Sequence, residues 1–155
     1  MALIGSTASA RCFGDERRDY ARALQEHYAN GPAPDWQQRF VTVYASSHPW
    51  KDWAETWAHY LHMTDTLETA AACGVSLKPT RPDEPSLKTG PAAAGTPERR
   101  FDRLIDSWYP LTYMLNSLNR GMGFADAYPF VLSTPAVEKL RAVHEIITAG
   151  DPERT

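Results

Sequence analysis

Cysteine is scarce in this sequence, and neither sign of charge is in large excess. Cys12 and Cys73 form no CxxC pair and no zinc-ribbon spacing, so neither a cysteine-based metal site nor a disulfide framework is expected. The net charge of −3, with no block of like charges, gives no support for nucleic acid as a partner. No apolar run approaches the roughly 18 residues of a membrane span. Residues 1–10 lack the features of a signal peptide. We therefore expect a cytoplasmic protein with reduced thiols that binds neither nucleic acid nor membrane.

Aromatic residues, in contrast, are plentiful. The 155 residues include five tryptophans and seven tyrosines, and 43% of them are hydrophobic, which indicates a folded chain with a real core. The length corresponds to one domain or to part of a larger one. We treat 1–155 as a single domain, and the resemblance described below implies that it is incomplete.

Helical periodicity predicts an all-α fold of five to six helices, punctuated by glycine and proline. The predicted helices cover residues 16–28, 35–44, 49–73, 97–120 and 135–149, and Pro110 should kink or split the fourth. His48 or Ser47 can cap the third helix, and Gly74 ends it. Residues 75–97 are rich in proline and glycine and predict a long flexible loop.

The predicted helix 49–73 carries an acid/histidine stripe, made up of Asp52, Glu55, His59 and His62. At about 100° per residue, these four side chains fall within a strip less than about 90° wide. The opposite side holds an aromatic and apolar set: Trp50, Trp53, Trp57 and Leu61. This separation predicts that the tryptophan side packs in the core.

Two interpretations of the stripe remain open. It is either the solvated face of a core helix, with Glu55 and His59 as an ordinary i,i+4 pair, or a face directed at a metal ion or another polar helix. Carboxylate and imidazole are suitable zinc ligands, and Glu55 and His59 could reach one ion.

Several unusual strings support a resemblance to a known family. They are Phe13-Gly14-Asp15-Glu16-Arg17-Arg18-Asp19-Tyr20, Asp35-Trp36-Gln37-Gln38-Arg39-Phe40, the whole of 48–62, Leu111-Thr112 with Leu115-Asn116 and Leu118-Asn119-Arg120, and Tyr128-Pro129-Phe130-Val131-Leu132-Ser133. With them the chain resembles the zinc-binding metallopeptidases of bacteria that are related to the gluzincin-type HExxH enzymes. The resemblance implies a zincin-like helical domain, a zinc cofactor and a peptide or protein substrate.

The sequence departs from that family at two points. It contains no HExxH, and its nearest string, His144-Glu145-Ile146-Ile147-Thr148, ends in threonine where the second histidine must stand. The resemblance also implies a glutamate ligand early in the second metal-site helix, and Lys51 occupies the matching position. An ammonium group opposes a metal ion by its charge.

We therefore predict the C-terminal portion of a metallopeptidase domain, truncated and catalytically inactive, with no catalytic residue of its own. Glu55 and His59 are the candidate metal ligands, and Lys51, Asp52 and His62 belong to a degenerate site around them. No tightly bound zinc is expected, and the stripe should line an open groove. The alternatives are a non-catalytic helical interaction module and a weak metal-binding protein.

Overall fold

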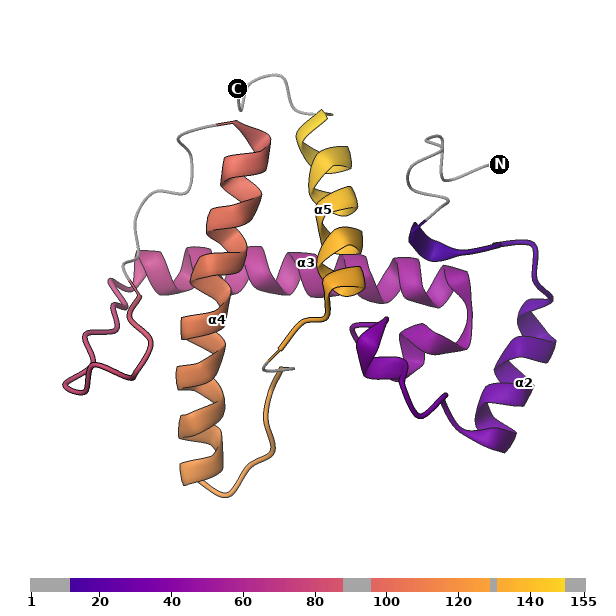
Figure 1. Ribbon diagram of the computed structural model, residues 1–155, viewed down its shortest axis with the longest axis horizontal. Helices are drawn as coiled ribbons and strands as arrows, with labels where there is room; N and C mark the ends of the chain where they lie inside the picture. Colours follow the sequence, from indigo (N-terminus) through magenta and orange to yellow (C-terminus); the bar gives the residue numbers. More distant parts are fainter. Residues whose placement is uncertain (1–11, 88–95, 129–130, 150–155) are drawn as a thin grey trace. The chain divides into compact units, whose positions relative to one another are not determined.

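The computed structural model describes residues 12–87, 96–128 and 131–149, and these residues are largely helical (Figure 1). The described residues contain four complete α-helices, two short 3-10 helices and no β-strand. They are α2 (Tyr20–Asn30), η1 (Trp36–Gln38), η2 (Tyr44–Ser47), α3 (Pro49–Ala72), α4 (Pro97–Gly121) and α5 (Thr134–Ala149). The all-α prediction is confirmed, with four α-helices in place of five or six. No helix in the described ranges has both the length and the hydropathy for a membrane crossing.

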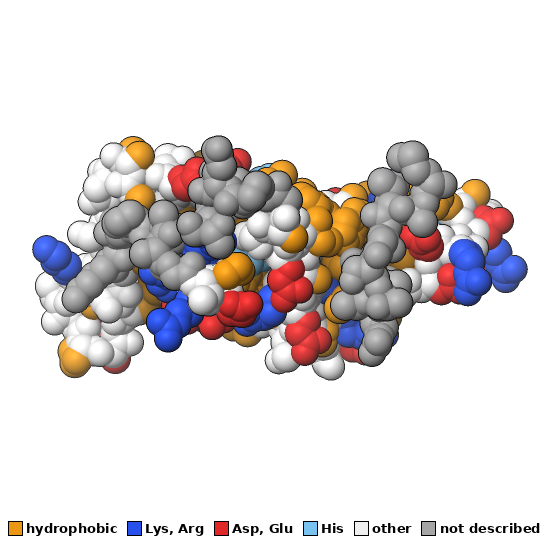
Figure 2. Space-filling model, turned by 90° about the horizontal axis from the view of Figure 1, so that it is seen from above, with side chains coloured by type: hydrophobic (Ala, Val, Ile, Leu, Met, Phe, Trp, Pro, Cys, Tyr) orange, Lys and Arg blue, Asp and Glu red, His pale blue; other side chains and the backbone are white. Residues whose placement is uncertain are grey.

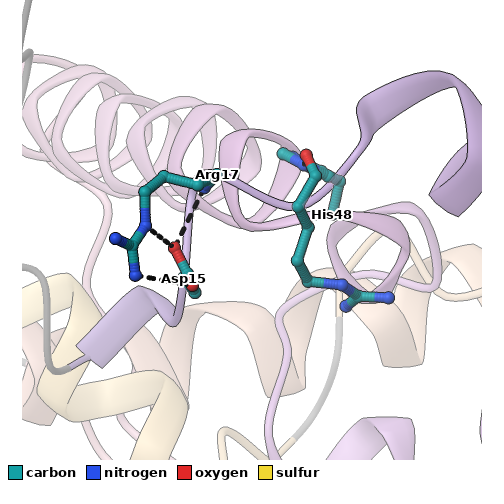
Figure 3. Close-up of polar contacts among 4 residues, drawn as sticks. Asp15, Arg17 and His48 are labelled. Atoms are coloured by element: carbon teal, nitrogen blue, oxygen red, sulfur yellow. Dashed lines mark hydrogen bonds and ion pairs between the residues drawn. The ribbon is translucent and has the colours of Figure 1, made fainter.

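The helix α2 begins later than the sequence suggested. Its cap is Asp19, whose side chain accepts the backbone N–H of Arg22 at 2.8 Å. Asp15, which directly precedes the predicted helix 16–28, instead accepts the backbone N–H and the guanidinium of Arg17 at distances from 2.9 to 3.1 Å (Figure 3). Asp15 is therefore satisfied inside the turn before the helix, and α2 starts at Tyr20.

The predicted helix at 35–44 is wrong. Asp35 makes no capping hydrogen bond, and only the single 3-10 turn η1 follows it. The β-branched run from Val41 to Val43 disfavours a helix, since its side chains lose rotamer freedom there. The hydroxyl of Thr42 accepts the backbone N–H of Ala45 at 3.0 Å, which starts the separate turn η2.

The long helix α3 matches its prediction to within one residue. Nδ1 of His48 accepts the N–H of Trp50 at 3.1 Å, so His48 caps the helix as expected. Since Nδ1 is an acceptor, Nε2 carries the proton and donates to the carbonyl of Arg18 at 3.0 Å. Gly74 follows the helix with a φ of 69°, a conformation that favours glycine.

Pro110 does not split α4, which is continuous over 25 residues. Thr96 caps it by accepting the N–H of Arg99, and Pro97 occupies the first turn, where a missing N–H costs little. Proline removes one ladder hydrogen bond, and the bonds on either side hold the remaining turns together. The last helix, α5, begins at Thr134, one residue before its predicted start.

The chain divides into two compact units, and α3 contributes to both. Unit 1 comprises Met1–Tyr60 and Leu132–Ile147, and unit 2 comprises Leu61–Val131 and Thr148–Thr155. In unit 1, Val41, Ala45 and Ala136 form a buried apolar cluster, with Phe40 packed against it.

Unit 2 has its own core, in which the segment after α3 takes part. Leu77 and Leu87 form an isolated antiparallel bridge, and Leu87 is buried with Ala70 and Leu111. The described part of the predicted flexible loop thus packs against α3 and α4. Residues 88–95 lie outside the described residues, and the flexibility of 75–97 stays a prediction.

Candidate functional site: the acid/histidine stripe of α3

The stripe is buried at its start rather than open along its length. Asp52 is 1% exposed and His59 is 5% exposed, and Thr56, which lies between them on α3, is fully buried. The prediction of an open groove is wrong for this part of the stripe. Glu55 is half-buried, and only His62 is exposed.

The tryptophan side of α3 is not the core face, contrary to prediction. Trp50 is 54% exposed and Leu61 is 46% exposed. Trp53 and Trp57 are half-buried, and Trp53 packs edge-on against Phe13 with ring centroids 4.9 Å apart. The helical period identified two opposite faces correctly. It could not show which of them the rest of unit 1 covers.

Asp52 is buried because α5 supplies its counter-charge. Nζ of Lys139 lies 2.6 Å from Oδ2 of Asp52, and the two side chains are 6% and 1% exposed. Burial raises the pKa of Asp52 to about 6, while the Lys139 ammonium acts in the opposite direction. The carboxylate is therefore neutralised inside unit 1 by a lysine that sequence analysis did not single out.

A signal for Lys139 does exist in the sequence. Ala136, Leu140 and Val143 are buried positions of α5, and Lys139 lies on the same side of that helix. A lysine at a core position is almost never buried without a partner, so its position predicts a buried acid elsewhere in the chain.

Glu55 is held by a neutral donor. The hydroxyl of Thr42 donates to its Oε2 at 2.9 Å. The same hydroxyl accepts the N–H of Ala45, so Glu55 is tied to the start of η2. This contact links α3 to the segment before it within unit 1.

The two histidines of the stripe belong to different units. His59 is in unit 1, whereas His62 is in unit 2, where its ring lies 6.1 Å from that of Tyr128. Across the described ranges, no group of three or more His, Cys, Asp or Glu side chains is placed to hold a metal ion. The structure therefore does not bring the predicted ligands Glu55 and His59 into such a group.

Lys51 faces aromatic rings. Its Nζ lies 4.8 Å from the ring centroid of Tyr44 and 5.5 Å from that of Tyr20. Hydrogen bonding to Tyr44, and then to Tyr20, raises the pKa of Lys51, and the same bond lowers the pKa of Tyr44. Lys51 therefore remains a cation, at the position where the resemblance implied a metal-binding carboxylate.

His144, part of the incomplete HExxH-like string, has a different place. Its Nδ1 lies 2.7 Å from the hydroxyl of Tyr60, and both residues are buried. Residues i and i+1 of a helix point in different directions, which agrees with Glu145 being exposed. His144 thus adds a second polar contact between α3 and α5 within unit 1.

The chain matches, over residues 5–146, the family described as "Putative zinc-binding metallo-peptidase", and it belongs to that family. It is 45% identical over 141 residues to "Uncharacterized protein Rv2568c" of Mycobacterium tuberculosis and to "Uncharacterized protein Mb2598c" of Mycobacterium bovis. These matches cover 91% of this chain and 39% of each relative, so the chain spans about two fifths of their length. No solved structure gives a significant match. The family resemblance drawn from the motifs is confirmed.

The described residues do not fit the zinc ion that the family description implies. A zinc site needs about three protein ligands around one point. Asp52 faces the ammonium of Lys139, and Glu55 accepts from Thr42. Both carboxylate oxygens of Asp52 and the hydroxyl of Thr56 are buried without a hydrogen bond of normal geometry, and Oδ2 lies 2.6 Å from the Lys139 ammonium. These oxygens belong to only two residues, so they do not make a three-ligand set.

Proposed function

We propose that this chain is the C-terminal portion of a zinc metallopeptidase domain and does not hydrolyse peptides by itself. The observation that carries the proposal is the state of the two stripe carboxylates of unit 1. Asp52 is paired with Lys139 at 2.6 Å, and Glu55 accepts from Thr42 at 2.9 Å. Both acids on this part of α3 are engaged by the protein itself.

The chemistry of the family supports the same proposal. A zinc peptidase activates a water molecule with a metal ion held by about three ligands and an open fourth position, next to a general base. The HExxH string supplies two of those ligands and the base, and this sequence does not contain it. Lys51, with its raised pKa, adds a positive charge near Glu55.

For the longer relatives we propose peptide hydrolysis, with peptides or proteins as substrates. For this chain we propose a cytoplasmic location, supported by the free thiols of Cys12 and Cys73. The intermixed acidic and basic side chains on the face shown in Figure 2 agree with a chain that does not bind nucleic acid through that face.

The test combines metal content with hydrolysis. The purified chain is saturated with zinc, dialysed and analysed for bound zinc, and it is then assayed on casein and on a library of fluorogenic peptides. The 45% identical protein of Mycobacterium tuberculosis is purified and treated in parallel. We expect this chain to retain no stoichiometric zinc and to show no turnover above buffer. Retained zinc together with turnover by this chain would overturn the proposal.

A second experiment addresses the proposed position within a longer domain. The coding DNA upstream of Met1 is translated in all frames. An HExxH string within some tens of codons supports a truncated frame, and its absence over that distance counts against truncation.

A further inference from the structure

We infer that the cation that neutralises Asp52, at the buried end of the acid/histidine stripe, is the ammonium of Lys139 and not a metal ion. The protein itself fixes this ammonium in place. Lys139 takes this place whether or not the chain hydrolyses peptides.

The ammonium of Lys139 is held on several sides. It lies 2.6 Å from Oδ2 of Asp52 and donates to the carbonyl of Arg39 at 2.7 Å. The ring of Phe40 lies 4.2 Å from Nζ and the ring of Phe13 lies 5.8 Å away. A carboxylate, a carbonyl and two aromatic faces are the groups that stabilise a cation taken out of water.

These partners come from separate parts of unit 1. Asp52 is on α3, Arg39 and Phe40 follow η1, Phe13 precedes α2, and Lys139 itself is on α5. Removing an ammonium from water is unfavourable, and it is tolerated when hydrogen bonds and an opposite charge replace the lost hydration. Three segments of unit 1 thus converge on the Nζ that α5 carries.

A metal ion at Asp52 would have to compete with that arrangement. It would stand within a few ångströms of the Lys139 ammonium, and two cations at such a distance repel each other strongly in a buried environment of low dielectric constant. The ion could bind only if Lys139 left its partners, and the carbonyl of Arg39 would then lose its donor. The tethered ammonium therefore excludes a divalent ion from Asp52.

The experiment measures unfolding of the full chain by urea, with excess EDTA, with excess zinc and with neither. The variants are Lys139→Met, the double variant Asp52→Asn/Lys139→Met, and Lys78→Met as a matched control. Lys78 is exposed and lies outside unit 1. The wild-type midpoint should not move with EDTA or zinc, Lys139→Met should lower it clearly, and the control should leave it unchanged.

The double variant keeps the inference testable if Lys139→Met fails to fold. Neutralising Asp52 removes the unpaired buried charge, so the double variant should have a higher midpoint than Lys139→Met alone. A wild-type midpoint that falls with EDTA would overturn the inference. So would a double variant that is no more stable than the single one.

Discussion

The hydroxyl of Tyr60 on α3 lies 2.7 Å from Nδ1 of His144 on α5, and both side chains are buried. The contact lies in the same unit as the Asp52–Lys139 pair, so two polar contacts join these helices inside unit 1. The Tyr60 hydroxyl donates when Nδ1 carries no proton and accepts when Nδ1 carries one, so the contact can form with either tautomer of His144.

Tyr60→Phe should lower the free energy of unfolding by about 1 kcal/mol, since it removes one net hydrogen bond and little apolar area. The pair is isolated by a double-mutant cycle with His144→Leu, followed by urea denaturation at neutral pH. A coupling energy close to zero would show that the 2.7 Å contact does not contribute to stability.

Stability should fall as the pH rises from about 4 to about 6, because of Asp52. Its folded-state pKa is raised from 3.8 to about 6, first by burial, so the native state binds more protons than the unfolded state in that window. The stabilisation from protonated Asp52 is complete below the pKa of this residue in the unfolded state. It is lost as the pH rises through the pKa of this residue in the folded state. The magnitude is on the order of 3 kcal/mol, from about 1.4 kcal/mol per pKa unit.

Asp52→Asn isolates this contribution, because the amide does not titrate. Free energies of unfolding are measured for wild type and variant across the pH window. The difference between them should change with pH in the stated direction. Asp15, whose pKa is lowered to about 2 by its hydrogen bonds to Arg17, acts below this window and is common to both proteins. Parallel pH profiles for the two proteins would contradict the assignment.

His48→Ala should destabilise the chain by about 1–2 kcal/mol, since it removes the cap of α3 and the hydrogen bond to the carbonyl of Arg18. The groups affected are the N–H of Trp50 and the carbonyl of Arg18. His48→Asn, which can still cap a helix, should recover part of the loss. Thermal unfolding of the two variants measures which of them is less stable. Equal losses of stability for His48→Ala and His48→Asn would argue against a capping role.

Trp50→Ala should lower the free energy of unfolding far less than Trp108→Ala does, although the sequence pattern predicted that Trp50 packs in the core. Trp50 is 54% exposed, whereas Trp108 is fully buried. Deleting a buried tryptophan typically costs about 3–5 kcal/mol. Urea denaturation of both variants provides the comparison. A loss for Trp50→Ala as large as that for Trp108→Ala would show that the tryptophan side of α3 is covered after all.

Local signals predicted the helices better than they predicted the site. Pro49 and Gly74 bracket α3, and both act through their own backbone conformation, so its bounds followed from the sequence. The predicted helix at 35–44 did not form, because β-branched residues and the hydroxyl of Thr42 favour a turn after Asp35.

The site depended on a contact between residues distant in the chain. Periodicity placed Asp52 and His59 on one side of α3, which is correct, and left open what covers that side. In the structure, Lys139 of α5 packs against Asp52 on that side. No local pattern in the sequence connects these two residues. A buried carboxylate and a buried ammonium each look unfavourable alone, and only their pairing makes both positions reasonable.

The most direct test of the account is an NMR measurement on the ammonium group of Lys139. In the chain labelled with nitrogen-15, the Nζ protons should exchange slowly and show cross-relaxation to the ring of Phe40, 4.2 Å away. Those signals should be the same in EDTA and in excess zinc. Fast exchange in the untreated chain, or loss of the contact with Phe40 when zinc is added, would contradict the claim that Lys139 is the resident cation at Asp52.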